Sequence, residues 1–233
     1  MRFPKPPSAT RPSSDLAALV SAAREIEACG RMMTREGGTM AERLAGPGRA
    51  IAAWQHYPDG GDIYDPASHA QYYFHAHDDG GPEIGHFHTF LRPAGMPPGV
   101  VPAAAEARAV SGPSHLVAIA VDAGGNPVRL FTTNRWVTDE TWYPADDVVR
   151  MLDRFAIDRR QPSWALNRWL TCLFVLFRPE MAALADARDE AVRRWALAHP
   201  DADPLEDRDL ETLSTIRVDL ARRIAAIDDA AGD

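Results

Sequence analysis

The histidines of this chain are concentrated in one short region. Six of the eight lie between His56 and His88. Four of these form two pairs in which a single residue separates the histidines, His75 with His77 and His86 with His88. Neutral imidazole is the commonest side-chain ligand for transition metals in proteins. Residues i and i+2 of a β-strand point to the same face, so each pair would place two imidazoles side by side. The spacing therefore indicates metal-binding chemistry.

The segment between the two pairs, residues 78–85, is rich in aspartate and glycine and is typical of a chain reversal. If a hairpin places His77 opposite His86, then His75 lies opposite His88. All four rings then share one face, with directly opposed Cβ atoms about 4.5–5.5 Å apart. We therefore predict a divalent transition metal, zinc or iron, bound by His75, His77, His86 and His88. A register shifted by one residue would put the pairs on opposite faces. Exposed strand histidines without a metal are the alternative interpretation.

Further side chains are candidates for a role beside this site. Glu83 lies between the pairs and can supply a carboxylate ligand, and it is also a catalytic candidate. His115 is the second catalytic candidate, because it opens a strand and would line the same cavity if the strands pair, although a hydrogen-bonded histidine at a strand end is the commoner case. A polar and aromatic segment follows the last of the predicted strands. It either lines a substrate pocket or packs as a strand-to-helix connection. Its candidate pocket residues are Arg135, Trp136, Trp142 and Tyr143.

The composition is that of an ordinary globular domain and narrows the possible partners. The 233 residues are 45% hydrophobic and 25% charged, with a net charge of −8. This acidic balance argues against nucleic acid and anionic membrane surfaces as partners, and a small-molecule substrate is the expected one. Cys29 and Cys172 lie in apolar helical patterns, so we expect them to pack as core residues. The first residues lack the apolar core of a signal peptide, and the longest apolar stretch, 169–177, is too short to span a bilayer. We expect a cytoplasmic protein.

The pattern of apolar residues predicts an α+β fold. Residues 1–12 are proline-rich and predicted to be a disordered tail, and residues 13–233 are predicted to form one domain. We expect a small antiparallel sheet of about four strands within the region from about 56 to 134, packed against helices from both ends of the chain. The C-terminal region, about 144–228, is predicted to be helical. Its predicted helices cover 144–155, a buried central stretch 169–177, 179–199, and a last helix from about 204 to 227, in which Leu213, Leu220 and Ile227 lie seven residues apart. Nearer the N-terminus, Thr39 and Glu42 have the spacing of a capping box, which predicts that a helix begins there.

Five strings together resemble an uncharacterised bacterial family known only as a domain of unknown function. They lie at residues 56–58, 61–66, 71–77, 85–92 and 130–136, and the resemblance extends from about residue 50 to about 180. This resemblance implies no activity. Cupins are partly similar, because His75 and His77 are followed by Glu83, but the many strands of a jelly roll are missing. JAMM-type metalloproteases are similar only in the pair His86 and His88, without the serine and aspartate that should follow.

The leading hypothesis from the sequence is a metal-dependent enzyme acting on a small molecule. A catalytic metal site keeps one position open, so three histidines with a water or substrate fit an enzyme better than four. The alternatives are a non-catalytic protein that binds, stores or senses a metal, and a metal-free protein-interaction module. Motifs for a serine nucleophile elbow, a phosphate loop, a dinucleotide-binding loop and a zinc-protease helix are missing from the sequence. Substrate, metal identity and oligomeric state are left open.

Overall fold

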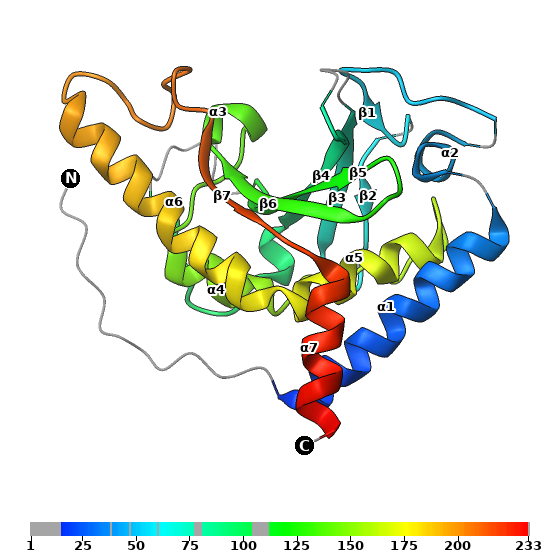
Figure 1. Ribbon diagram of the computed structural model, residues 1–233. Helices are drawn as coiled ribbons and strands as arrows, with labels where there is room; N and C mark the ends of the chain where they lie inside the picture. Colours follow the sequence, from blue (N-terminus) through cyan, green and yellow to red (C-terminus); the bar gives the residue numbers. More distant parts are fainter. Residues whose placement is uncertain are drawn as a thin grey trace.

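The computed structural model describes residues 15–37, 39–46, 48–59, 61–76, 81–103 and 112–232. Within these residues the chain forms one antiparallel sheet, with helices packed on one of its faces (Figure 1). The predicted α+β class and antiparallel sheet are confirmed. The predicted disordered tail, residues 1–12, lies outside the described residues.

The sheet contains seven described strands, so the prediction of about four is wrong. The strand order is β1-β3-β4-β5-β6-β7, and β2 also pairs with β3. The four predicted strands form the middle of the sheet, and three short strands extend its edges. The strands are β1 (His56–Tyr57), β2 (Ile63–Tyr64), β3 (Ala70–Ala76), β4 (Glu83–Leu91), β5 (Ser114–Asp122), β6 (Pro127–Thr133) and β7 (Thr212–Arg217).

The helices begin where local capping signals allow. Thr39 and Glu42 form a reciprocal capping box at the start of α2, as the sequence predicts. Ser163 caps α5 through the backbone N–H of Leu166. The helices are α1 (Leu16–Glu36), α2 (Met40–Ala45), α3 (Arg135–Thr138), α4 (Ala145–Leu152), α5 (Trp164–Leu176), α6 (Arg178–Ala198) and α7 (Leu220–Gly232), with a short 3-10 helix at Pro93–Gly95.

Helix α5 is the central buried helix that the apolar stretch predicts. Its residues Leu166, Leu170 and Leu173 are fully buried. On one side the α5 residue Asn167 accepts a hydrogen bond of 2.6 Å from the hydroxyl of Tyr72 in β3. On the other side Arg168 pairs with Glu25 of α1. The main hydrophobic core therefore lies between the sheet and its helices, and the opposite face of the sheet carries different side chains.

The predicted last helix, about 204–227, is wrong in its first half. Residues 212–217 form β7 instead, which pairs with β6 and places the Ser214 Oγ 2.7 Å from the Thr132 Oγ1. The spacing of Leu213, Leu220 and Ile227 suggested one helix, but these residues belong to a strand and to α7. The Thr-Leu-Ser-Thr-Ile-Arg sequence contains three β-branched residues, which favours a strand once β6 offers a free edge.

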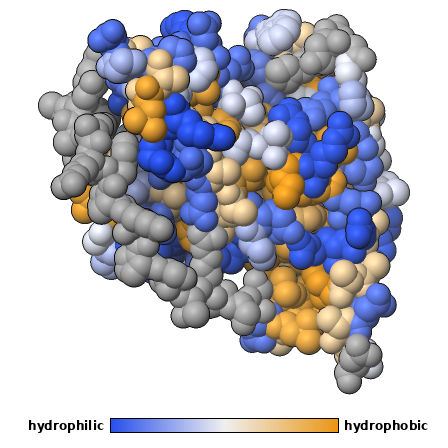
Figure 2. Space-filling model, turned by 60° about the vertical axis from the view of Figure 1, so that its left-hand side comes forward, coloured by the Kyte–Doolittle hydropathy of each residue, from blue (hydrophilic) through white to orange (hydrophobic). Residues whose placement is uncertain are grey.

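Helices α1 and α7 pack together at the end of the molecule opposite the sheet (Figure 1). Figure 2 shows apolar side chains gathered at this end. Leu16 is 41% exposed there, and Leu220 and Ile224 are partly buried. No helix within the described residues is long and apolar enough to cross a membrane.

Candidate histidine site

The hairpin of β3 and β4 has a different register from the predicted one, but the same face. His75 lies opposite His86, and Tyr73 lies opposite His88. The predicted pairing of His75 with His88 is therefore wrong by two residues. Because side chains alternate with a period of two, this shift leaves His75, His86 and His88 on one face. The remaining predicted ligand, His77, lies outside the described residues.

Gly85 explains why the hairpin has this register. It lies opposite Ala76 at an irregularity of β4, and its φ is +148°. A Cβ at this position would lie 2.2 Å from the carbonyl oxygen of His75 and 2.6 Å from the ring of Phe74. Only glycine permits so close an approach of the two strands, so this register requires glycine at position 85.

Five histidines form a continuous row across this face, which we call the histidine file: His56, His75, His86, His88 and His115. Successive ring centroids are 5.1, 5.5, 4.5 and 5.1 Å apart. The first ring is exposed and the second is half-buried. The remaining three are 7%, 3% and 2% exposed. The file therefore leads from the surface into the interior of the protein.

The three inner histidines are joined by hydrogen bonds. The Nε2 atoms of His86 and His88 are 2.8 Å apart, and the Nδ1 of His88 is 3.1 Å from the Nε2 of His115. Burial, together with the nearby charges of Arg188 and His86, lowers the pKa of His115 to about 3. A neutral imidazole has one donor and one acceptor nitrogen. If His88 accepts from His86, it must donate to His115, and if it accepts from His115, it must donate to His86. The tautomers of the three rings are therefore linked.

Two alanines on β5 make room for these rings. Ala118 lies between His88 on β4 and Phe131 on β6, and Ala120 occupies the equivalent place beside His86. Both alanines are fully buried and pack with Phe131 in a small cluster separate from the main core. Side chains from β4 and β6 thus meet above a part of β5 that contributes only two methyl groups, those of Ala118 and Ala120.

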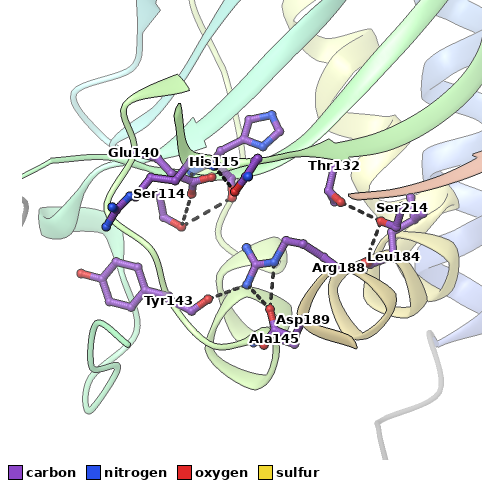
Figure 3. Close-up of polar contacts among 12 residues, drawn as sticks. Ser114, His115, Thr132, Glu140, Tyr143, Ala145, Leu184, Arg188, Asp189 and Ser214 are labelled. Carbon is purple, nitrogen blue, oxygen red and sulfur yellow. Dashed lines mark hydrogen bonds and ion pairs between the residues drawn. The ribbon is translucent and has the colours of Figure 1, made fainter. Parts of the chain in front are cut away.

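The inner end of the file is fixed by Glu140, which follows α3. Its Oε2 accepts a hydrogen bond of 2.7 Å from the backbone N–H of His115, as Figure 3 shows. Glu140 is 2% exposed, and burial raises its pKa to about 8 against the opposing influence of Arg188. Among the described residues the hydroxyl of Thr133 is buried without a hydrogen-bond partner, whereas the side chain of Thr138 interacts with the Glu140 carboxyl and lowers its pKa. This end of the site is therefore polar and incompletely satisfied.

Arg188 of α6 holds the neighbouring segment in place. Its guanidinium donates to the carbonyl oxygen of Tyr143 at 2.5 Å and to the Oδ1 of Asp189 at 2.8 Å, as Figure 3 shows. The same group lies 4.0 Å from the ring centre of Trp142. Two predicted pocket residues, Trp142 and Tyr143, are therefore buried contacts of an arginine that the sequence analysis did not single out.

The other two predicted pocket residues pack against the loop before β7. Arg135 donates to Glu206 at 2.8 Å, and the indole N–H of Trp136 donates to the carbonyl oxygen of Leu210 at 3.1 Å. The four candidates thus take part in two separate packing arrangements. The catalytic candidate Glu83 forms a two-pronged ion pair with Arg129, at 2.7 and 2.6 Å, on the rim of the histidine face.

Several residues of the site carried weak signals in the sequence. Tyr73 stands two residues before His75, so strand alternation alone places it on the histidine face. Glu140 belongs to the polar and aromatic segment that the sequence analysis singles out, whereas Arg188 carries no local signal, because its contacts join distant parts of the chain. Within the described residues, no group of three or more histidine, cysteine, aspartate or glutamate side chains is arranged to hold a metal ion.

The fold and the site together define an α+β protein whose antiparallel sheet carries helices on one face and the histidine file on the other. The chain matches the model of a family described as a domain of unknown function (DUF6969) over residues 20–218. It therefore belongs to this family, and the resemblance to an uncharacterised family is confirmed over a longer span than expected. No curated protein and no solved structure matches the chain.

Proposed function

We propose that the protein is a metal-dependent enzyme acting on a small molecule, with a divalent transition metal bound between His86 and His88. The observation that supports this most is the 2.8 Å separation of their Nε2 atoms. Two imidazole nitrogens bound to one tetrahedral zinc at about 2.0–2.1 Å lie about 3.3 Å apart, so the two rings would need to separate by only about 0.5 Å for one ion to replace the shared proton. The two residues are consecutive on one face of β4, which holds them without help from a loop.

His115 would act as the residue that orients the ligand His88. Metal-binding histidines usually donate their second ring N–H to a neighbouring acceptor, which fixes the tautomer. The Nδ1 of His88 faces the Nε2 of His115, and that imidazole stays neutral because of its burial. If His88 donates to His115, its Nε2 is left with a lone pair for the metal.

An ion with two histidine ligands retains positions for water and substrate, which favours catalysis over a purely structural role. His75 is the nearest further imidazole on the open side, with its ring 5.5 Å from that of His86. A third ligand from this side would still leave one position of a tetrahedral ion open.

Metal analysis of protein purified without a histidine tag tests the proposal. We expect close to one equivalent of a first-row metal in the parent protein and a loss of most of it in His86→Ala and His88→Ala. His199→Ala is the matched control, because His199 stacks on Trp195 at the end of α6, away from the file. Equal metal content in all four proteins, each checked for folding by circular dichroism, would place the ion elsewhere.

A metal-free role is the second candidate, and the hydrogen bonds of the file favour it. These bonds account for the positions of His86, His88 and His115 without any ion. The face would then serve as a proton-responsive surface for another protein. Protein that stays metal-free after incubation with zinc or iron, and whose histidine nitrogen resonances are unchanged by either metal, would favour this candidate.

A further inference from the structure

Trp54 combines two unfavourable features at the open end of the histidine file. Its backbone φ is +64°, in a region that bulky residues rarely adopt. Its side chain is 64% exposed, although tryptophan has a large apolar surface. Backbone strain of this kind concentrates at ligand-binding and active sites. An exposed ring on a strained backbone therefore calls for a reason beyond packing.

The backbone around Trp54 holds the indole beside the file. The backbone N–H of Trp54 donates to the carbonyl oxygen of Ala76 at 2.9 Å, and the backbone N–H of Ala76 donates to the carbonyl oxygen of Gln55 at 3.1 Å. These two bonds extend the pairing of β1 with β3 beyond the end of the strands. The indole meets the ring of His75 edge to face, with centroids 6.1 Å apart.

Other flat rings lie at the same exposed end of the file. The exposed ring of His56 stacks on Tyr73, with centroids 4.5 Å apart and planes inclined by 23°. His75 lies between these rings and the buried His86. Aromatic rings prefer offset-stacked or edge-to-face neighbours, so this exposed group of rings suits another flat ring better than a saturated one.

We propose that Trp54 is a binding residue for a flat aromatic molecule carrying an anionic oxygen, such as an aromatic carboxylate. The ring would lie over His75 against the indole, and the oxygen would point toward His86 and His88. The position of the oxygen rests on the proposed metal function. The stacking on Trp54 does not depend on it.

Benzoate and cyclohexanecarboxylate are a matched pair of probes, because both carry one carboxylate and only the first is flat. Calorimetric titration should show benzoate binding at least fivefold more tightly to the parent protein. Trp54→Ala should weaken benzoate binding by about three- to tenfold, and Trp54→Phe should restore most of it. Trp164→Ala is the control, because Trp164 is 40% exposed at the start of α5. Equal binding of the two probes, or an unchanged affinity in Trp54→Ala, would overturn the proposal.

Repeating the titration after metal removal separates this proposal from the metal function. We expect weaker benzoate binding but a retained preference over cyclohexanecarboxylate that still requires Trp54. Loss of the preference without metal would overturn the stacking role. A protein that never binds metal, yet keeps a preference dependent on Trp54, would overturn the metal function alone.

The backbone strain supplies an independent measurement. Asparagine tolerates positive φ better than tryptophan, so Trp54→Asn should raise the melting temperature while it lowers benzoate affinity. This opposite movement of stability and binding is the signature of a residue kept for a ligand. A lower melting temperature in Trp54→Asn would show that the indole is kept for packing, against the proposal.

Discussion

His86 meets Phe131 edge to face, with ring centroids 5.0 Å apart and planes inclined by 83°, although a whole strand separates the two residues. The contact exists because the intervening strand, β5, carries alanine at positions 118 and 120 on this face. The geometry of the histidine file thus depends on two residues with no chemistry of their own.

Ala118→Leu should disrupt the file. The larger side chain would occupy the space between His88 and Phe131, and overpacking of this kind costs about 1–3 kcal/mol. Urea unfolding should show this loss, and the nitrogen resonances of His86 and His88 should shift. Ala198→Leu, at an exposed position of α6, should change neither. A stable Ala118→Leu variant with unchanged histidine resonances would mean that the alanines do not shape the site.

Gly85→Ala should destabilise the hairpin strongly, since a Cβ there would overlap the carbonyl oxygen of His75. We expect a loss of about 2 kcal/mol or more from the strained backbone and the clash. Gly30→Ala is the matched control, because Gly30 lies within α1 with open space around it. That change should stabilise the protein by about 0.5–1 kcal/mol. Similar unfolding midpoints for the two variants would contradict this account of the register.

Glu140 should make the protein less stable as the pH rises. Its folded-state pKa of about 8 lies above the ordinary value, so its contribution is full below about pH 4.5 and is lost as the pH rises through 8. Glu140→Gln keeps the shape and removes the titration. The variant should therefore lose less stability than the parent between about pH 5 and pH 9 in urea unfolding. Glu211→Gln, at an exposed position, should follow the parent. Parallel pH profiles for parent and Glu140→Gln would argue against a protonated Glu140.

His115 should make the protein less stable at acidic pH. Its folded-state pKa of about 3 lies below the ordinary value, so folding keeps it neutral and stability falls as the pH drops from about 6.5 toward 3. Nitrogen spectra of the histidine side chains should show His115 unprotonated at about pH 5, whereas the same residue in urea should titrate near 6.5. A His115 ring that gains its proton near pH 6.5 in the folded protein would be incompatible with the buried position.

The shared face of the histidines could be predicted from the sequence, and their register could not. Alternation with a period of two places His75, His86 and His88 together in any register shifted by an even number of residues. The choice among these registers depends on the contact of Gly85 with His75, which forms only when the two strands are already paired. The capping box at Thr39 was predictable because it involves four consecutive residues.

The inner end of the site could not be predicted, because it is assembled from distant segments. Arg188 reaches the carbonyl oxygen of Tyr143 across 45 positions of the chain. Glu140 contacts the backbone of His115 across 25 positions. Strand β7 could not be predicted for the same reason, since residues 212–217 become a strand only where β6 offers an edge.

The position of β7 has a consequence for synthesis of the protein on the ribosome. Strand β6 is complete at Thr133, but its partner begins at Thr212, after α4, α5 and α6 have been translated. During that interval the nascent chain presents an unpaired strand edge, which is a template for pairing with other chains. When the C-terminal segment leaves the ribosome, β7 pairs with β6 and covers that edge. Chains whose synthesis stalls before β7 should therefore aggregate more than complete chains.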